Sequence, residues 1–430
     1  FNSPDSASMQ KTAGTPTDNN KWTFSAWVKR SKLGTLQEIF YGEANSTNYC
    51  TIRFNDTSDT LTFKNRPGST TSTLTTTQVF RDPNAWYHLV VVLDTSNGTA
   101  ADRDIIYING VRETNFSTET HSGSGDVCFI NSNGNPIKIS KGNSASFFDG
   151  YMAEVNFIDG QALAASDFGE FDEDSGIWKP IDASGLTFGN NGFYLDFKDS
   201  ANLGNDANGG TDLTESNLAA TDQATDTCTN NFATFNPIYK SLSQPTFTNG
   251  NLSSSASGSG YRLSFSTIAV STGKWYAEFY RAVGSTDEVF IGISSLNDAE
   301  TLFNVTDYYL GETAKSISIS SGNGKYYISA SGTTYGSSYL GSGDIIGVAL
   351  DLTNKKLYAS KNGAWSNGSG AWSSTTFNAS TGAIDISSII SSGEYAYIGF
   401  SNTGTSTVDA NFGNGYFGTT PVSSAGTNAS

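Results

Sequence analysis

The chain has 430 residues, a formal net charge of −17, 13% aromatic residues and only 15% charged residues. This length allows two or three domains with sizeable cores. The acidic balance argues against nucleic acid and anionic membranes as partners, and the absence of an apolar run of about 18 residues argues against membrane insertion.

Strand patterns follow one another closely in the first third of the chain. In "WTFSAWVKR", Trp22, Phe24 and Ala26 alternate with polar residues, which is typical of a half-buried strand. Val90 to Leu93 are apolar on both faces, which is typical of a central strand. Short strands separated by turn residues predict a sandwich or barrel. The strands are expected at residues 22–30, 38–42, 49–55, 60–65, 85–94, 104–110, 136–141 and 150–159.

From about Leu163 the sequence becomes acidic and irregular, with one short helical turn expected after Ala164 and one strand at 192–197. The stretch from Lys198 to Ile238 is rich in Asn, Asp, Thr and Gly. It is too poor in large apolar residues to form its own core. We therefore predict an ordered wrap or linker that ends near Tyr239.

Strand patterns resume at about Pro245. The expected strands lie at residues 261–270, 273–283, 288–295, 316–332, 343–363 and 394–402. The stretch "GVALDLTNKKLYASKNGAW" in this part repeats the pattern of "VVVLDTSNGTAADRDIIYINGVRE" in the first part. Each has a buried strand, a turn, and a second strand that leads into an Asn-Gly hairpin turn. The two stretches are predicted to be equivalent parts of two separate sandwiches.

The predicted fold is all-β, with two antiparallel jelly-roll-like β-sandwiches joined by an irregular acidic connector. The first sandwich is expected at residues 1–165 and the connector, with one or two short strands, at 166–240. The second sandwich is expected at 241–422, and 423–430 form a flexible tail.

The first 165 residues resemble laminin-G-like domains of the concanavalin A-like lectin/glucanase superfamily. The resemblance rests on "WTFSAWVKR", on "WYHLVVVLDT" followed by "DIIYINGV", and on "FFDGYMAEVNFIDGQAL". Residues 241–422 resemble SPRY domains through "GKWYAEF", "FIGIS" and "GDIIGVALDLTNKKLYASKNGAW". SPRY folds are binding modules, so this resemblance implies no catalysis.

Residues 186–240 are similar to a segment that follows such domains in structural proteins of marine bacteriophages. Together the resemblances imply a phage appendage or surface protein, such as a tail fibre or head decoration. The chain starts "FNSPDSASM" without Met. An upstream segment is therefore expected, which could carry an export signal and attach the chain to the particle.

The motif "EFDED" has the spacing of the Glu-x-Asp-x-Glu strand motif of glycoside hydrolases in the same superfamily. Glu170, Asp172 and Asp174 would lie on one face of a strand. A charged Glu173 at the intervening position and loop-like flanks favour a solvated acidic loop instead. No catalytic residue is therefore assigned.

Calcium is the one cofactor for which the sequence offers candidate ligands. Acidic side chains gather in two loops, and Ca²⁺ takes six to eight oxygen ligands. The alternative is that these carboxylates bond to their own backbone in Asx turns. The resemblance to laminin-G-like domains also allows a calcium ion at a loop rim. The loop candidates are Asp94, Asp102 and Asp104 in one loop and Asp199, Asp206 and Asp212 in the other.

Aromatic residues in Gly-, Ser- and Asn-rich segments are the candidates for ligand binding. Trp365 and Trp372 lie in "KNGAWSNGSGAWSS", and Tyr335 and Tyr339 lie in "GTTYGSSYLG". Exposed aromatic side chains in such loops indicate glycan or protein contact. The alternative is that the two tryptophans fold back onto the sandwich.

His88 has strand neighbours and no Ser or Cys beside it in the sequence, so we expect it to be structural. The cysteines Cys50, Cys128 and Cys228 have neither metal-type spacing nor a disulfide pattern. We expect them to be small, buried apolar side chains.

The function predicted from the sequence is that of a non-enzymatic phage virion surface protein, a tail fibre or other appendage. It would bind host-surface glycans or proteins through sandwich loops, outside the cell, with several copies raising avidity. Other virion proteins and a homotrimer are further expected partners. Two alternatives stay open: an architectural decoration protein of capsid or tail that contacts only the virion, and a polysaccharide-degrading glycoside hydrolase.

Overall fold

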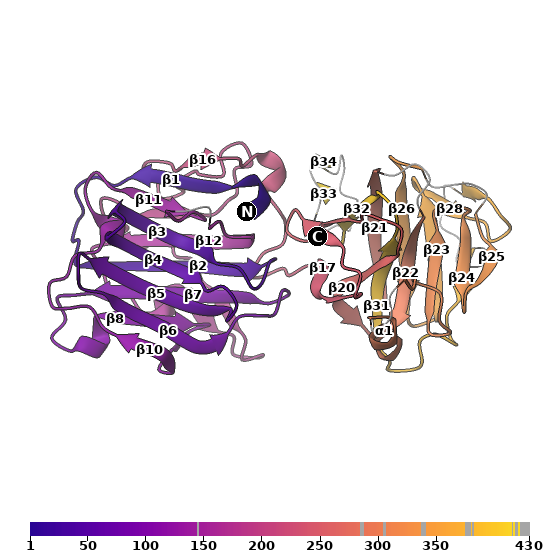
Figure 1. The fold of residues 1–430 in the computed structure, drawn as a ribbon, viewed down its shortest axis with the longest axis horizontal. Helices are drawn as coiled ribbons and strands as arrows, with labels where there is room; N and C mark the ends of the chain where they lie inside the picture. Colours follow the sequence, from indigo (N-terminus) through magenta and orange to yellow (C-terminus); the bar gives the residue numbers. More distant parts are fainter. Residues whose placement is uncertain are drawn as a thin grey trace. The chain divides into compact units, whose positions relative to one another are not determined.

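The computed structural model describes residues 1–143, 146–283, 288–303, 307–336, 341–374, 380, 382–414, 416–417 and 420–421 (Figure 1). The chain forms two compact units, Phe1–Asn231 and Phe232–Ser430. Residues 166–231, most of the predicted connector, belong to the first unit. The predicted tail lies outside the described residues. The regular structure is nearly all antiparallel β, which confirms the predicted fold class.

The first unit is built from two large sheets and one short hairpin, counted over its described residues. The eight-stranded sheet has the order β10 (Phe116–Thr120), β6 (Ser72–Val79), β5 (Thr60–Pro67), β4 (Asn48–Phe54), β3 (Gln37–Asn45), β11 (Pro136–Ile139), β1 (Ser8–Thr12), β16 (Thr214–Ser216). The six-stranded sheet has the order β15 (Phe193–Leu195), β12 (Gly150–Asp159), β2 (Lys21–Arg30), β7 (Trp86–Asp94), β8 (Asp104–Ile108), β9 (Val111–Arg112). The hairpin pairs β13 (Gly169–Phe171) with β14 (Trp178–Pro180).

The core of the first unit lies between its two large sheets. Phe24 of β2 stacks on Phe40 of β3 with ring centroids 4.4 Å apart, and both are fully buried. The inward residues of β7 alternate, with Leu89, Val91 and Leu93 in this core. Apolar burial on this scale supplies most of the stabilisation of a sandwich.

The other face of β7 is covered as well. Val90 and Val92 pack with Phe168, Ala183 and Phe188 in a second cluster. The acidic segment after Leu163 therefore covers the outer face of the six-stranded sheet. This confirms the central, doubly buried strand that the unbroken apolar run predicts.

The second unit also consists of two large sheets, counted over its described residues. The seven-stranded sheet has the order β17 (Phe235–Lys240), β20 (Arg262–Val270), β31 (Ala396–Asn402), β22 (Val289–Ser295), β23 (Ser316–Ser320), β24 (Lys325–Ile328), β25 (Ser331–Thr334). The nine-stranded sheet has the order β18 (Thr246–Thr248), β19 (Ser253–Ser255), β32 (Thr407–Asn411), β21 (Lys274–Val283), β26 (Ile345–Asp351), β27 (Lys356–Lys361), β28 (Ala364–Ser366), β29 (Trp372–Ser374), and β30 (Ile384–Asp385) pairs with β27.

A third, small sheet and a short helix complete the regular structure described in this unit. Strands β33 (Tyr416–Phe417) and β34 (Thr420–Pro421) pair with each other. Helix α1 (Leu296–Phe303) follows β22 directly and lies beside β20 and β22. Single turns of 3-10 helix occur in the first unit at Ser3–Asp5, Ala100–Asp102, Phe129–Asn131, Ala165–Asp167 and Ala220–Asp222.

The two repeated sequence stretches form the same local structure in the two units. Asn109 and Asn362 have φ of 47° and 48°, and each precedes a glycine that also has positive φ. The Asn109 carboxamide oxygen accepts a hydrogen bond from the backbone N–H of His88 at 2.8 Å. The Asn362 carboxamide oxygen accepts one from Ile345 at 2.8 Å. Each Asn-Gly turn therefore also caps the neighbouring strand of its own sheet.

The aspartates that end the first strand of each stretch are also equivalent. Asp94 lies opposite Lys21 in the β2–β7 pair, and their charged groups are 3.7 Å apart. Asp351 lies opposite Lys274 in the β21–β26 pair, at 3.6 Å. Both ion pairs close the end of a central strand pair.

Candidate functional site

The nine-stranded sheet of the second unit carries an aromatic pair on its outer face, in which Tyr276 is exposed and Trp365 is half-buried. Along β21, Ala277 and Phe279 are buried in the core, so the alternating residues Tyr276 and Glu278 lie on the opposite face. The Tyr276 side chain is 51% exposed. The ring of Trp365 from β28 is 6.2 Å from it, with an interplanar angle of 48°.

Strand register and a glycine position these two rings. Glu278 of β21 lies opposite Gly347 of β26, Gly347 opposite Ser360 of β27, and Ser360 opposite Trp365. A Cβ on Gly347 would lie 2.5 Å from the Tyr276 hydroxyl oxygen and 2.5 Å from the Ser360 Oγ. The missing side chain at Gly347 therefore makes the space in which Tyr276 lies along the sheet toward Trp365. We name Tyr276, Glu278 and Trp365 the aromatic platform.

The charge at the platform is a single carboxylate. The Tyr276 hydroxyl donates a hydrogen bond to Oε1 of Glu278 at 2.8 Å. Burial and this carboxylate raise the pKa of Tyr276, so that the hydroxyl stays protonated at neutral pH. Oε2 of Glu278 accepts no hydrogen bond from the residues that the structure describes. The platform thus offers flat apolar ring faces beside a free acceptor, which suits a sugar ring with its hydroxyl groups.

Trp372, predicted to act together with Trp365, lies on the opposite face of the same sheet. It is opposite Ser366 in the β28–β29 pair and packs against the core. Its ring meets Tyr335 edge-on, with centroids 5.8 Å apart, and fills the space beside Gly336. Trp372 therefore folds back onto the sandwich, as the alternative interpretation expected for both tryptophans.

Tyr335 is only 2% exposed. Its hydroxyl donates to the carbonyl of Gly382 at 2.6 Å and accepts from the N–H of Ala359 at 3.0 Å. Burial raises its pKa to about 12. Tyr339, the fourth predicted ligand residue, lies outside the described residues.

Tyr276 was not among the predicted ligand residues, although the signal is present in "KWYAEFYRAV". Apolar Ala277 and Phe279 at every second position place Tyr276 and Glu278 on the other face. Its pairing with Trp365 requires the register of four strands, which the sequence alone does not supply.

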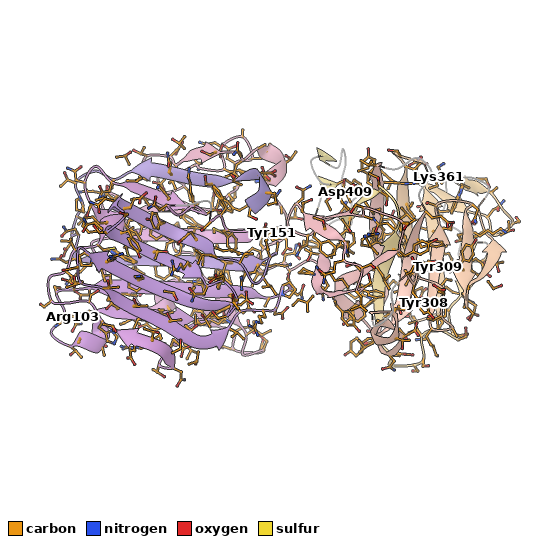
Figure 2. All side chains as sticks on the ribbon, viewed as in Figure 1. Arg103, Tyr151, Tyr308, Tyr309, Lys361 and Asp409 are labelled. Atoms are coloured by element: carbon orange, nitrogen blue, oxygen red, sulfur yellow. The ribbon has the colours of Figure 1, made fainter. Side chains whose placement is uncertain are left out.

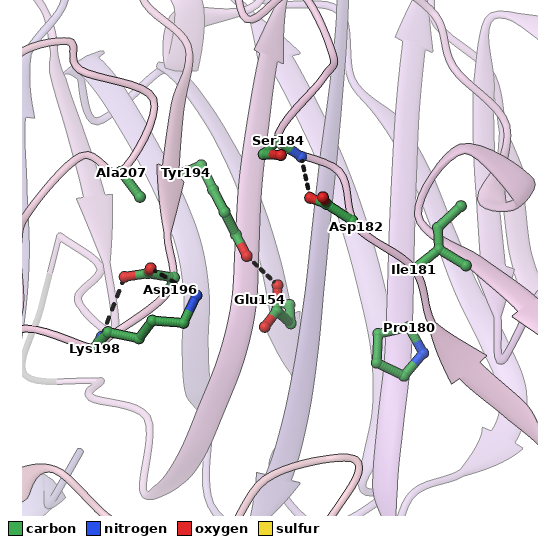
Figure 3. A pocket seen from close by; sticks show the side chains of 9 residues that line it. All are labelled: Glu154, Pro180, Ile181, Asp182, Ser184, Tyr194, Asp196, Lys198 and Ala207. Atoms are coloured by element: carbon green, nitrogen blue, oxygen red, sulfur yellow. Dashed lines mark hydrogen bonds and ion pairs between the residues drawn. The ribbon is translucent and has the colours of Figure 1, made fainter.

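A pocket of about 440 Å³ lies on the first unit (Figure 3). Glu154 reaches it from a bulge in β12, where its φ is 49°. The pocket is lined by Glu154, Pro180, Ile181, Asp182, Ser184, Tyr194, Asp196, Lys198 and Ala207.

The carboxylates of this pocket already have partners within it. The Tyr194 hydroxyl donates to Glu154, the Ser184 N–H donates to Asp182 at 2.9 Å, and Lys198 pairs with Asp196 at 3.2 Å (Figure 3). Tyr194 is 7% exposed and presents no free ring face. The pocket is therefore a weaker candidate for sugar stacking than the platform.

His88 has a serine neighbour in space that the sequence did not reveal. Ser25 lies on the adjacent strand β2, and its Oγ is 2.9 Å from Nε2 of His88. The Trp178 indole N–H donates to Nδ1 of His88 at 2.9 Å. Nδ1 must then be unprotonated, so Nε2 carries the proton and donates to Ser25. Burial lowers the pKa of His88 to about 3, so this pair does not activate Ser25 as a nucleophile.

The acidic motif "EFDED" starts in a strand, and not entirely in the loop that we predicted. Glu170 is in β13, and the chain turns at Asp172 toward β14. Lys179 lies 3.3 Å from Glu170 and 3.1 Å from Asp172. Hydrogen bonds from Ser175 and Lys179 lower the pKa of Asp172. Both carboxylates are thus tied to one exposed lysine.

The predicted calcium ligands take part in local hydrogen bonds. Asp104 accepts bonds from Ser122, and Asp102 pairs with Arg112 at 2.8 Å. Asp206 accepts bonds from the N–H groups of Tyr194 and Asn208. Within the described part of the chain, no three His, Cys, Asp or Glu side chains are arranged to hold a metal ion. A calcium site stays a prediction.

The seven-stranded sheet carries a tyrosine-rich cluster beside α1. Tyr309, labelled with Tyr308 in Figure 2, stacks on Phe290 at 4.3 Å and meets Tyr327 edge-on at 6.0 Å. These rings cover one another and the apolar cluster under them. They are less available to a ligand than Tyr276.

Among the described residues, the cysteines provide no reactive nucleophile and the helices provide no membrane-spanning segment. All three cysteines are free, and Cys50 and Cys128 are buried. Burial raises the pKa of the Cys228 thiol to about 12, which makes it a poor nucleophile at neutral pH. Over the same residues, no helix has the length and apolar character needed to cross a membrane.

One family model matches part of the chain. The family model described as the concanavalin A-like lectin/glucanases superfamily matches residues 4–167. This confirms the resemblance predicted for the first 165 residues. No curated protein matches the chain.

Solved structures are similar to parts of the chain. The SPRY domain of human HERC1 is 16% identical with a TM-score of 0.31, over 41% of this chain and 96% of that chain. Domains LG4-5 of the mouse laminin alpha1 chain are 9% identical with a TM-score of 0.29, over 92% and 79%. The heptameric SAP-like pentraxin from Limulus polyphemus is 16% identical with a TM-score of 0.29, over 37% and 73%.

Proposed function

We propose that this chain is a non-enzymatic carbohydrate-binding protein and that the aromatic platform is its sugar site. The single observation that carries the proposal is the exposed Tyr276 ring next to the half-buried Trp365 ring, beside the Oε2 of Glu278. An exposed aromatic ring that continues into a second, half-buried ring leaves apolar surface in water, so its presence on a sheet face favours a ligand. The match of residues 4–167 to a lectin and glucanase superfamily supports the same class of ligand.

The absence of catalysis is part of the proposal. His88 donates a hydrogen bond to Ser25 and so cannot take its proton, and Lys179 pairs with Glu170 and Asp172 of the acidic motif. Neither arrangement provides a base beside an exposed nucleophile, or two free carboxyl groups that flank a sugar bond.

The place of action that we propose is the surface of a phage particle, as a tail fibre or other appendage that contacts host-surface glycans. The low content of charged residues, 15% of the chain, supports it. A single platform would bind weakly, and several copies on one particle would raise avidity by about 10² to 10⁴.

The experiment is a glycan panel probed with the protein coupled to beads in many copies, in calcium and then in chelator. Saturable binding to a subset of glycans by the wild type, lost in Tyr276→Ala, supports the proposal. Loss of binding in chelator would assign calcium a role as well. A wild type that binds no glycan in either condition would contradict it.

A further inference from the structure

The eight-stranded sheet of the first unit carries a second aromatic group on its outer face, in a different chemical setting. Directly opposite residues of an antiparallel pair share one face of the sheet. Lys138 of β11 lies opposite Tyr41 of β3, Tyr41 opposite Thr51 of β4, and Thr51 opposite Lys64 of β5. These four side chains therefore form one row across the sheet.

The neighbouring row adds another ring and another cation. Tyr49 of β4 lies opposite Arg66 of β5, two residues from Lys64 along the same strand. The Tyr41 and Tyr49 rings stack at 6.0 Å with an interplanar angle of 25°. Lys64 and Arg66 lie 5.6 and 5.9 Å from the centre of the Tyr49 ring, and Lys138 lies 5.3 Å from that of Tyr41. We name these five residues the basic tyrosine patch.

Two of the three cations lack a carboxylate partner among the described residues. Lys138 is paired with Glu43 at 2.9 Å. Lys64 and Arg66 form no ion pair with any residue that the structure describes. The nearby Arg53 lies 3.9 Å from Glu38, and burial raises the pKa of Glu38 to about 7. The patch therefore keeps excess positive charge on a chain whose formal charge is −17.

We propose that the basic tyrosine patch binds an anionic saccharide, with a sugar ring on Tyr49 and its carboxylate or sulfate between Lys64 and Arg66. This site is independent of the aromatic platform, which lies on the other unit and carries a negative charge. It adds acidic glycans to the ligand classes of the chain.

The setting of the patch favours a saccharide over other anions. Strand β4 is paired on both sides, with β3 and β5 (Figure 1), so an acidic peptide cannot add to it as a strand. Duplex nucleic acid carries one charge per ~1.7 Å, which calls for many more cations than Lys64 and Arg66. An acidic polysaccharide carries its charges on separate sugar rings, and the half-buried Tyr49 ring offers a flat face for one of them, whereas Tyr41 beneath it is only 3% exposed.

The test is electrophoresis of the full chain in native gels that contain alginate, dextran sulfate or uncharged dextran. We expect retardation in alginate if the patch prefers carboxylates, in dextran sulfate if it prefers sulfates, and none in dextran. Added salt should weaken the retardation, because the contacts are ionic. A wild type that migrates alike in all three gels would overturn the proposal.

Two charge variants locate the site. Lys64→Gln/Arg66→Gln should weaken binding about tenfold or more, since each lost contact is charge-assisted. Lys64→Arg/Arg66→Lys should retain binding. The control Lys198→Gln/Lys274→Gln changes the net charge equally at side chains that are 79% and 71% exposed. Equal retardation of the wild type and Lys64→Gln/Arg66→Gln would overturn the assignment.

Two further variants and a competitor distinguish this site from the aromatic platform and from a general polyanion surface. Tyr49→Ala keeps every charge and should still weaken binding about fivefold or more, since it removes the ring face. Tyr276→Ala should leave retardation unchanged, so failure at one site is distinguishable from failure at the other. Single-stranded DNA is added as a competitor at the same concentration of charge as the alginate. If it displaces the protein from alginate, the site binds polyanions in general and the proposal of a saccharide site is overturned. Thermal unfolding verifies that each variant is folded.

Discussion

The ammonium group of Lys29 donates a hydrogen bond to the carboxylate of Asp226 at 2.7 Å, and both side chains are buried. The two residues are 197 positions apart. The Trp86 indole also donates to Asp226 at 3.0 Å, and the Asn231 side chain accepts from Lys29 at 2.8 Å. Tyr151, labelled in Figure 2, lies over the ammonium, 5.7 Å from it. This ion pair fastens the end of the acidic segment to strand β2.

Removing one partner of this pair should strongly destabilise the first unit. Lys29→Met leaves a buried carboxylate without its cation, which should lower the free energy of unfolding by about 3–5 kcal/mol. For a unit of this size the midpoint of thermal unfolding should fall by roughly 10 °C. Calorimetry measures the change. The double variant Lys29→Met/Asp226→Leu should recover most of it, and a Lys29→Met variant as stable as the wild type would contradict the role of the pair.

Glu38 should make stability depend on pH. Its pKa is raised by burial to about 7 from 4.5, so the folded state binds a proton that the unfolded state releases between these values. The stabilisation is fully present below pH 4.5 and is lost as the pH rises through 7, with a total of roughly 3 kcal/mol. Glu38→Gln should therefore be more stable than the wild type at pH 8 and nearly equal to it at pH 4.

His88 makes stability depend on pH in the opposite direction to Glu38. The quantity to measure is therefore the difference in the free energy of unfolding between Glu38→Gln and the wild type. Its pKa is lowered to about 3 from 6.5, so its contribution is present above pH 6.5 and is lost as the pH falls toward 3. Urea unfolding of wild type and Glu38→Gln at several pH values cancels this contribution. A difference that stays constant from pH 4 to pH 8 would refute the assignment to Glu38.

Ser25 should be unreactive. The side chain is 1% exposed, and His88 donates to it and does not accept its proton. We expect a fluorophosphonate probe to leave Ser25 unmodified in the folded protein, as read by mass spectrometry of its peptides. If the probe labels Ser25 in the wild type but not in a His88→Gln variant, His88 activates Ser25. That result would refute the tautomer of His88 assigned above.

Gly347→Ala should disturb the aromatic platform without touching either ring. The new methyl group would lie 2.5 Å from the Tyr276 hydroxyl, so the ring must move. We expect glycan binding to fall about tenfold or more, as for loss of an aromatic anchor. Gly98→Ala is the matched control, because its Cβ would meet nothing within 4 Å. If Gly347→Ala binds the glycan as well as the wild type does, the position of Tyr276 does not matter for binding and Tyr276 is not part of the site.

Much of the fold could be predicted from local sequence. The Asn-Gly turns at Asn109 and Asn362 were predicted because positive φ and a following glycine leave few alternatives. The predicted strand at 85–94 lies at Trp86–Asp94. Strand β6 was missed because its threonine-rich sequence has few apolar residues, although Leu74 enters the core. Helix α1 was missed because eight residues are too few for a clear helical period.

The site was predicted less completely than the fold. Trp365 was selected for its loop-like context and lies in the platform, whereas Trp372, chosen on the same grounds, packs inward. The turn between them changes which face each residue occupies, and composition does not encode that change. Tyr276 and the basic tyrosine patch depend on register across several strands, which only the folded structure supplies.

The most direct measurement of the central claim is a binding titration with the panel glycan that the wild type binds most strongly. It compares Trp365→Ala with Trp275→Ala, an equally drastic change at a 52% exposed tryptophan next to Tyr276 in sequence but on the other side of β21. The account predicts that Trp365→Ala weakens binding about tenfold or more and that Trp275→Ala binds as the wild type does. Equal binding by all three proteins, or loss only in Trp275→Ala, would contradict it.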